Sequence, residues 1–173
     1  MNIFKLIKNN IENILDNIED NDNIKDFIYK FNEKEYIKLI FKGRGAYGLI
    51  FQIINYTNCI KDIPKNDSLI LKVIKVKCEE MEKCKQLKKK MDNVKKNSLK
   101  NILVNKYCTK IINIKTINNL DLIFFEYIDG YDLKDYIINN NLSENDLNII
   151  YLKCLISIKV FHKILDYSHR DIK

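Results

Sequence analysis

Proline and glycine, the residues that most often interrupt regular structure, are scarce in this chain. It has one proline and four glycines among 173 residues, and no segment has the Gly/Ser composition of a flexible linker. Hydrophobic residues make up 46% and charged residues 31%, a balance that is typical of a globular chain rather than a disordered one. This length is enough for one ordinary domain with a sizeable core.

Long apolar runs and metal-ligand spacings are also missing from the sequence. No apolar run reaches the roughly 18 residues that a transmembrane helix needs, and the first residues, MNIFKLIKNNIENIL, lack the unbroken apolar core of a signal peptide. The five cysteines form no CxxC pair, so no zinc site is predicted and reduced thiols are expected. We therefore expect a cytoplasmic protein with no metal site and no membrane partner.

The residues in excess are Asn, Ile and Lys, whose codons are AT-rich. This favours an AT-rich genome, such as that of a large DNA virus or a protist. For a viral protein, the expected location becomes the host cytoplasm or the virion.

The net charge of +7 is concentrated in one basic segment, KCKQLKKKMDNVKK, at residues 83–96. Such a segment attracts nucleic acid or an acidic partner, or it is simply the solvated face of a helix. No aromatic residue interleaves with these lysines, so a surface for stacking bases is not indicated. A nucleic-acid partner is therefore not expected.

Apolar spacing predicts the order of the secondary-structure elements. A helical stripe runs through residues 2–19, and the segment 24–31 is compatible with helix or strand. The remaining predicted elements are strands at 36–42, 49–56 and 68–76, a helix at 81–94, strands at 110–117 and 120–128, a short helix after Tyr131, and a long helix at 143–165. Asn118 and Asn119 form the predicted turn between the last two strands, and Ser143-x-x-Asp146 is a helix start signal.

The segment GRGAYG at residues 43–48 lies between two predicted strands. A dinucleotide-binding loop would run from a strand into a helix, so that phosphates meet the helix N-terminus. Here the residues after Gly48 are LIFQII, which predict a strand. The glycines therefore belong to a hairpin, in which their N–H groups can approach phosphate oxygens closely.

Two further segments suggest phosphate chemistry. Lys72 stands in the middle of the apolar strand LILKVI, where a lysine is costly unless its ammonium meets an anion. The alternative is an edge strand with Lys72 and Lys75 in solvent. In the closing HRDIK, Asp171 could accept a proton from a hydroxyl group, and Lys173 could stabilise charge on a transferring phosphate.

Together these segments resemble the protein kinase family. GRGAYGLIF, LILKVIK, FFEYIDGYDL and HRDIK occur in the order of that family's glycine loop, third-strand lysine, hinge and catalytic loop. The resemblance covers residues 36–173, and the lysine of HRDIK resembles serine/threonine kinases. It implies an α+β fold: a kinase N-lobe at 36–128, with a five-stranded antiparallel sheet and one major helix, and the first helices of an incomplete C-lobe at 129–173. Residues 1–35 would be a helical extension.

The resemblance assigns the glycine segment to ATP. Gly43, Gly45 and Gly48 match the family's glycines over the phosphates. Tyr47 matches the tip of the loop, and Ile50 matches the apolar position above adenine.

It also assigns the charged residues. Lys72 matches the lysine of the α- and β-phosphates, and Lys75 is the second choice because it lies on the opposite strand face. Asp171 matches the catalytic base, which His169 and Arg170 support.

The hinge segment would hold the adenine and the ribose. Phe125 matches the gatekeeper, and Glu126 and Tyr127 begin the hinge. The backbone at Glu126 and Ile128 would meet adenine, and Asp132 matches the acidic residue near the ribose.

Two departures from the family pattern shape the functional hypothesis. The acidic partner of Lys72 is expected near Leu99 or Lys100, where no acid exists, and the other acids of the region come earlier in the chain. These are Glu79, Glu80, Glu82 and Asp92. The partner stays unassigned.

The sequence given ends at Lys173, before the family's catalytic-loop Asn and its D-F-G segment. We therefore expect the ATP-binding part of a serine/threonine kinase that is truncated or split, or a fragment of a longer gene product. It would be inactive alone, with Mg²⁺ bound only in the intact enzyme. Its partners would be ATP, a protein substrate, and a second chain or downstream segment that supplies the C-lobe. The alternative is a non-catalytic, pseudokinase-like module that binds a nucleotide or a protein.

Overall fold

The computed structural model describes residues 10, 27–30, 36–45, 48–55, 68–74, 79–96 and 98–168. The chain divides into two compact units. The sheet unit comprises Met1–Cys84 and Ile111–Tyr127, and the helical unit comprises Lys85–Lys110 and Ile128–Lys173. Apart from Asn10, the predicted helix over 2–19 lies outside the described residues.

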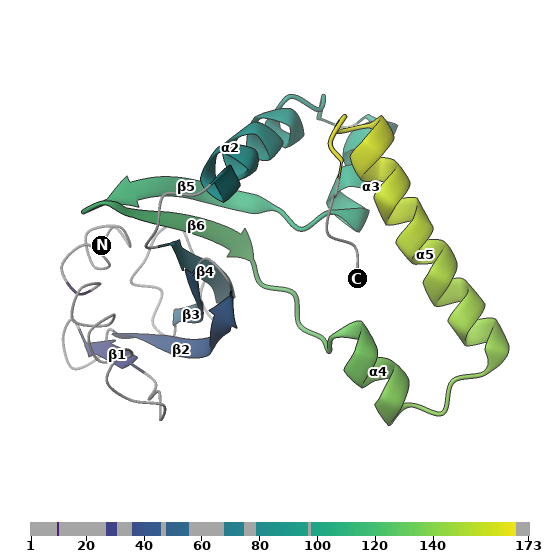
Figure 1. Cartoon of the computed structure of the whole chain (residues 1–173), viewed down its shortest axis with the longest axis horizontal. Coiled ribbons are helices and arrows are strands. Elements are labelled where there is room, and N and C mark those ends of the chain that lie inside the picture. The colour runs from purple at the N-terminus through teal and green to yellow at the C-terminus, as the bar shows by residue number, and fades with distance from the viewer. Residues whose placement is uncertain are drawn as a thin grey trace. The chain divides into compact units, whose positions relative to one another are not determined.

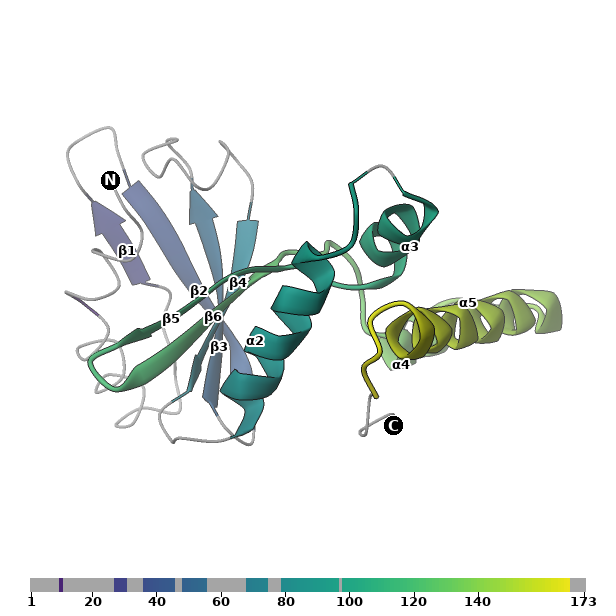
Figure 2. The ribbon, with the colours of Figure 1, turned by 90° about the horizontal axis from the view of Figure 1, so that it is seen from above.

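Six strands in the described part of the sheet unit form one antiparallel sheet, in the order β1-β2-β3-β4-β6-β5 (Figure 1). They are β1 (Phe27–Lys30), β2 (Tyr36–Gly45), β3 (Gly48–Asn55), β4 (Ser68–Ile74), β5 (Ile111–Ile117) and β6 (Leu120–Glu126). The predicted α+β class is confirmed. The view from above shows β1 to β4 side by side (Figure 2).

The predicted number of five strands is wrong, because the ambiguous segment around residue 28 forms an additional edge strand. β1 pairs with β2 with Phe27 opposite Leu39 and Lys30 opposite Tyr36. Phe27 and Tyr29 pack against the core, whereas Ile28 and Lys30 are exposed. This period of two is satisfied by a strand and not by a helix.

One face of the sheet carries the main apolar core. The side chains alternate along each strand, so every second residue contributes to it. The fully buried members include Phe51 in β3, Leu71 in β4, and Leu122 and Phe124 in β6. Phe41 packs edge-to-face on Phe51, with ring centroids 5.6 Å apart.

β5 and β6 form a hairpin around Asn118 and Asn119, as the sequence predicts. These residues have φ values of 49° and 62°. Positive φ at both central positions is typical of a type I′ turn, and asparagine tolerates it better than most residues. The hydroxyl of Thr116 donates to Asp121 across the hairpin at 2.7 Å.

Between β4 and β5 the described residues form two helices, where the sequence predicted one. The predicted helix over 81–94 corresponds to α2 (Glu79–Asp92), and α3 (Leu99–Tyr107) follows it. Ser98 caps α3, since its hydroxyl accepts a hydrogen bond from the Asn101 N–H at 3.1 Å. α3 has only 9 residues, so its apolar pattern was too short to predict a separate helix.

Two further helices follow β6: α4 (Leu133–Asn139) and α5 (Glu144–Lys163). The predicted start signal of α5 is confirmed as a reciprocal capping box between Ser143 and Asp146. No helix in the described residues is long and apolar enough to cross a membrane. The helical unit has a small core of its own, in which the buried residues are Val104, Cys108, Val160 and Leu165.

Candidate functional site

The glycine segment is part of a β-hairpin. β2 ends at Gly45, β3 begins at Gly48, and these two glycines pair across the strands. The prediction of a strand after Gly48 is therefore confirmed, and the segment is not the strand-to-helix turn of a dinucleotide site. Tyr47 lies outside the described residues.

Gly48 and Gly43 in this hairpin differ in what surrounds the position of a side chain. A Cβ atom at Gly48 would lie 2.0 Å from the carbonyl oxygen of Val73 in β4, so packing between strands β3 and β4 requires glycine there. A Cβ atom at Gly43 would meet no described residue within 4 Å. Sheet packing thus explains Gly48 without any ligand, and it leaves open space beside the backbone at Gly43.

Lys72 lies in an interior strand, so the alternative of an edge strand with Lys72 in solvent is wrong. β4 pairs with β3 on one side and with β6 on the other. Lys72 is opposite Ile50 and Ile123, and Ile50 is in turn opposite Gly43. These residues form a row across four strands, and only 18% of the Lys72 side chain is exposed. Lys75 lies outside the described residues.

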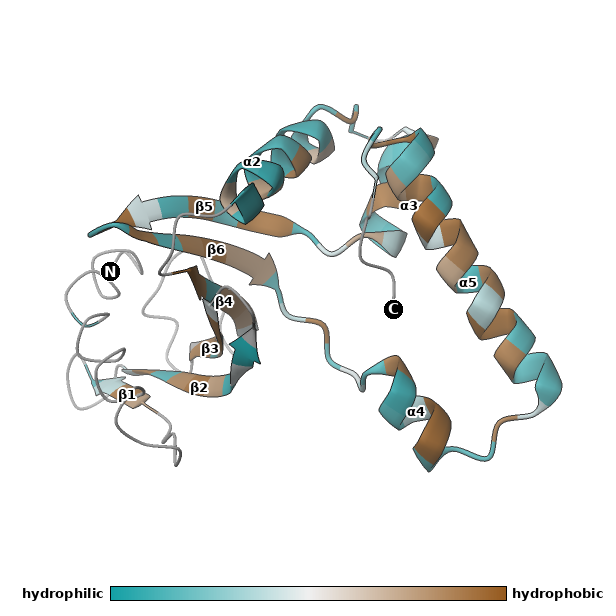
Figure 3. Ribbon diagram, viewed as in Figure 1, coloured by the Kyte–Doolittle hydropathy of each residue, from teal (hydrophilic) through white to brown (hydrophobic). Residues whose placement is uncertain are grey.

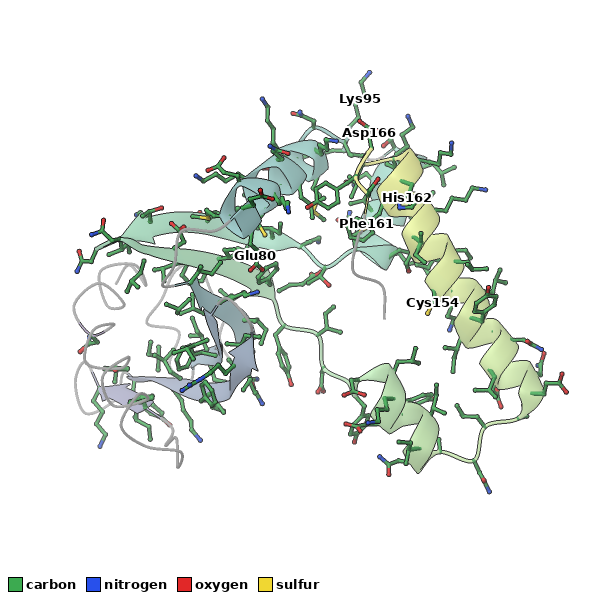
Figure 4. All side chains as sticks on the ribbon, in the orientation of Figure 1. Glu80, Lys95, Cys154, Phe161, His162 and Asp166 are labelled. Carbon is green, nitrogen blue, oxygen red and sulfur yellow. The ribbon has the colours of Figure 1, made fainter. Side chains whose placement is uncertain are left out.

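Glu80 in the first turn of α2 neutralises Lys72. The Lys72 Nζ atom lies 2.5 Å from Glu80 Oε1, and 27% of the Glu80 side chain is exposed. The other carboxylate oxygen, Oε2, is buried and has no hydrogen-bond partner among the described residues. Figure 4 labels Glu80 beside the sheet. The lysine is therefore held in place by an ion pair that leaves one acceptor unused.

The sequence left the partner of Lys72 unassigned, and the structure selects one of four acids. Glu79 pairs with Lys83 at 2.9 Å, and Asp92 pairs with Lys88 at 2.9 Å, both along the surface of α2. The expected position near Leu99 falls in α3, which has no acid. Glu80 is only eight residues after Lys72 in the sequence, and this proximity is the signal that could have identified it.

The gatekeeper candidate shares the sheet face of Lys72. Phe125 is two residues from Ile123 along β6, so both side chains project to the same side. It pairs with Ile70 in β4, whose side chain is likewise on the Lys72 face. Glu126 ends β6 and Tyr127 follows it. Gly43, Ile50, Lys72 and Phe125 are thus gathered on one face of the sheet.

The remaining predicted site residues lie in the helical unit or outside the described residues. Ile128 and Asp132 belong to the helical unit, and Ile128 is 62% exposed. Asp132 caps α4, because its Oδ1 accepts a hydrogen bond from the Asp135 N–H at 2.8 Å. Helix capping therefore accounts for an acid at this position. His169, Arg170, Asp171 and Lys173 lie outside the described residues.

No protein-family model matches the sequence, and a comparison with curated proteins finds no match. Across the residues that the structure describes, no group of three or more His, Cys, Asp or Glu side chains is placed to hold a metal ion.

Proposed function

We propose that the sheet unit binds ATP and is the nucleotide-binding part of a serine/threonine protein kinase. The observation that carries the proposal is the mostly buried ion pair between Lys72, in the interior strand β4, and Glu80, in α2. A cation in an apolar strand is costly to bury, and a structural role alone would be served as well by an apolar residue. A function that needs a positioned ammonium group explains why lysine is there.

In this proposal Glu80 holds the Lys72 ammonium against the α- and β-phosphates of ATP. An ammonium offers three donors, and the ion pair with Glu80 Oε1 occupies one of them. The open space at Gly43 lets the hairpin backbone approach the same phosphates. The β2–β3 hairpin and the lysine of β4 would then bind one polyphosphate from the same face of the sheet.

The apolar residues beside Lys72 suit a flat base. Ile50 is the cross-strand neighbour of Lys72 and is half-buried, as is Phe125 in the next row of the same face. Adenine would lie against these side chains and reach the backbone at Glu126, where β6 ends. Ile128 and Asp132 belong to the helical unit, and only the resemblance to kinases assigns them to adenine and ribose.

Transfer of the γ-phosphate to a protein hydroxyl is assigned to the HRDIK segment. Asp171 would accept the hydroxyl proton, and Lys173 would stabilise the phosphate charge. In the intact enzyme Mg²⁺ would neutralise the phosphates. The described residues hold no cluster for that ion, so no step is assigned to it here.

ATP binding by the full 173-residue chain tests the proposal. Isothermal titration should give a measurable affinity, and Lys72→Met should weaken it by roughly 10- to 100-fold, the effect of losing a hydrogen bond to a charged group. Lys115→Met is the matched control, because Lys115 is an exposed lysine of the same sheet, in β5. Glu80→Gln should lower the affinity by less than Lys72→Met.

Equal effects of Lys72→Met and Lys115→Met would refute the assignment of Lys72. A folded chain without any ATP affinity would instead favour a module that binds a protein partner.

A further inference from the structure

The lysine-rich stretch from Lys95 to Lys115, most of which lies in the helical unit, is not explained by nucleotide binding in the sheet unit. Between Asp92 and Asp121 the sequence contains no acidic residue. The same stretch contains Lys95, Lys96, Lys100, Lys106, Lys110 and Lys115. Four of these, Lys95, Lys96, Lys100 and Lys106, are exposed on the α2–α3 connection and on α3.

Two aliphatic side chains lie among these lysines on the outer side of α3. Leu99 is 71% exposed and Ile102 is 56% exposed. Leu99, Ile102 and Lys106 follow each other at steps of three and four residues, so they share one stripe of the helix. We call these two aliphatic residues and the four lysines Lys95, Lys96, Lys100 and Lys106 the basic–aliphatic surface.

The opposite side of α3 explains why this stripe stays outside. Leu103, Val104 and Tyr107 pack into the core of the helical unit. That core fixes the rotation of the helix and turns Leu99 and Ile102 away from it. A solvated helix face would carry polar residues at both positions.

Lys95, in the connection before α3, is held by hydrogen bonds from the helix cap Ser98. The Ser98 N–H donates to the carbonyl of Lys95 at 3.2 Å, and the Ser98 hydroxyl donates to the same carbonyl at 2.7 Å. Figure 4 shows the Lys95 side chain pointing away from the ribbon. None of the four lysines forms an ion pair with an acid of the described chain, in contrast to Lys88, which pairs with Asp92.

We propose that the basic–aliphatic surface docks the protein on an anionic lipid membrane. Lysines attract the negative surface of such a membrane, while adjacent aliphatic side chains enter the boundary between headgroups and acyl chains. A nucleic acid would use the lysines but not the aliphatic residues, and the surface has no exposed aromatic residue for stacking on bases. The sequence-based expectation of no membrane partner rested on the lack of a membrane-spanning segment, and docking of this kind needs none.

Vesicle flotation with the full chain tests the proposal. The chain should float with vesicles of phosphatidylserine and phosphatidylcholine and not with vesicles of phosphatidylcholine alone. Changing Lys95, Lys96, Lys100 and Lys106 to Gln should lower partitioning at least a hundredfold, since each lysine contributes about fivefold. Raising the salt concentration should also weaken binding, because it screens the lysines.

Two further variants identify the cause of any loss. Leu99→Ser with Ile102→Ser keeps every charge and should lower partitioning on the order of tenfold. The matched control changes the exposed lysines Lys134, Lys153, Lys159 and Lys163 of α4 and α5 to Gln, and it should float like the original chain. Circular dichroism confirms that each variant is folded.

Three results would overturn the proposal. Equal flotation with neutral vesicles would assign binding to other apolar side chains. An equal loss of flotation in the control variant would show that binding depends only on the net charge of the chain. Tighter binding to a DNA duplex than to vesicles, lost with the four lysines but kept in the Leu99 and Ile102 variant, would make the surface a nucleic-acid site.

Discussion

Leucines meet different surroundings in the two units of this protein. Leu122 in β6 is completely buried in the core of the sheet unit, whereas Leu152 in α5 leaves 57% of its surface exposed in the helical unit. The contrast extends to whole elements. Every strand from β2 to β6 contributes buried residues, but α4 contributes none, and in α5 every residue from Glu144 to Leu155 except Ile150 is exposed.

The difference shows that the two units hold their secondary structure in different ways. Strands in the sheet are fixed by cross-strand pairing and by one shared apolar core. α4 and the first half of α5 instead rely on local signals, namely the caps at Asp132 and Ser143. Their apolar residues, visible in brown in Figure 3, contribute little burial. We therefore expect the sheet unit to be the more stable of the two.

The largest effect on stability is expected from changing a leucine to alanine, tested at one position in each unit. Leu122→Ala should lower the free energy of unfolding by about 2–5 kcal/mol, because it opens a cavity in the sheet core. Leu152→Ala should change it by less than about 0.5 kcal/mol, because this side chain already contacts water. Urea unfolding followed by circular dichroism measures both. Similar losses would show that α5 is covered in solution.

A smaller effect is expected from breaking one ion pair in each unit. Glu80→Gln leaves Lys72 in a mostly buried position without its counter-charge, which should cost about 1–3 kcal/mol of unfolding free energy. Asp92→Asn breaks the exposed pair with Lys88 and should cost less than about 0.5 kcal/mol. The same urea titrations compare them. An Asp92 variant that loses as much as the Glu80 variant would contradict the burial of the Lys72 pair.

The smallest effect concerns the cap of α5 and depends on pH. Hydrogen bonds from the side chain and backbone of Ser143 lower the pKa of Asp146 below its ordinary value of 3.8. The stability that the Asp146 carboxylate contributes is therefore fully present above pH 3.8 and is lost as the pH falls through its lowered pKa. Asp146→Asn should be less stable than the original chain at pH 6, and the two should converge in strong acid.

Glu144→Gln is the control for the pH experiment, because Glu144 lies in the same first turn but outside the capping box. A pH-independent difference between the original chain and Asp146→Asn would contradict the role of the carboxylate.

Local features of the sequence by themselves determined much of the fold. Alternating apolar residues placed β2, because a half-buried strand repeats every two residues. Short apolar, β-branched runs placed β3, β4, β5 and β6. Asn118 and Asn119 marked the turn of the β5–β6 hairpin, since they tolerate positive φ. Ser143 and Asp146 marked the start of α5. Each of these signals involves groups only a few residues apart, so no knowledge of distant packing was needed.

Only the tertiary structure decided the surroundings of Lys72. Its strand became interior because β6, far along the chain, pairs beside β4. Its counter-ion became Glu80 because α2 returns its first turn to that strand, while Glu79 and Asp92 pair along the helix surface. The same non-local packing added β1 to the sheet edge and turned Leu99 outward on α3. A sequence pattern records how often apolar residues recur, but only packing between distant segments determines which of them meet.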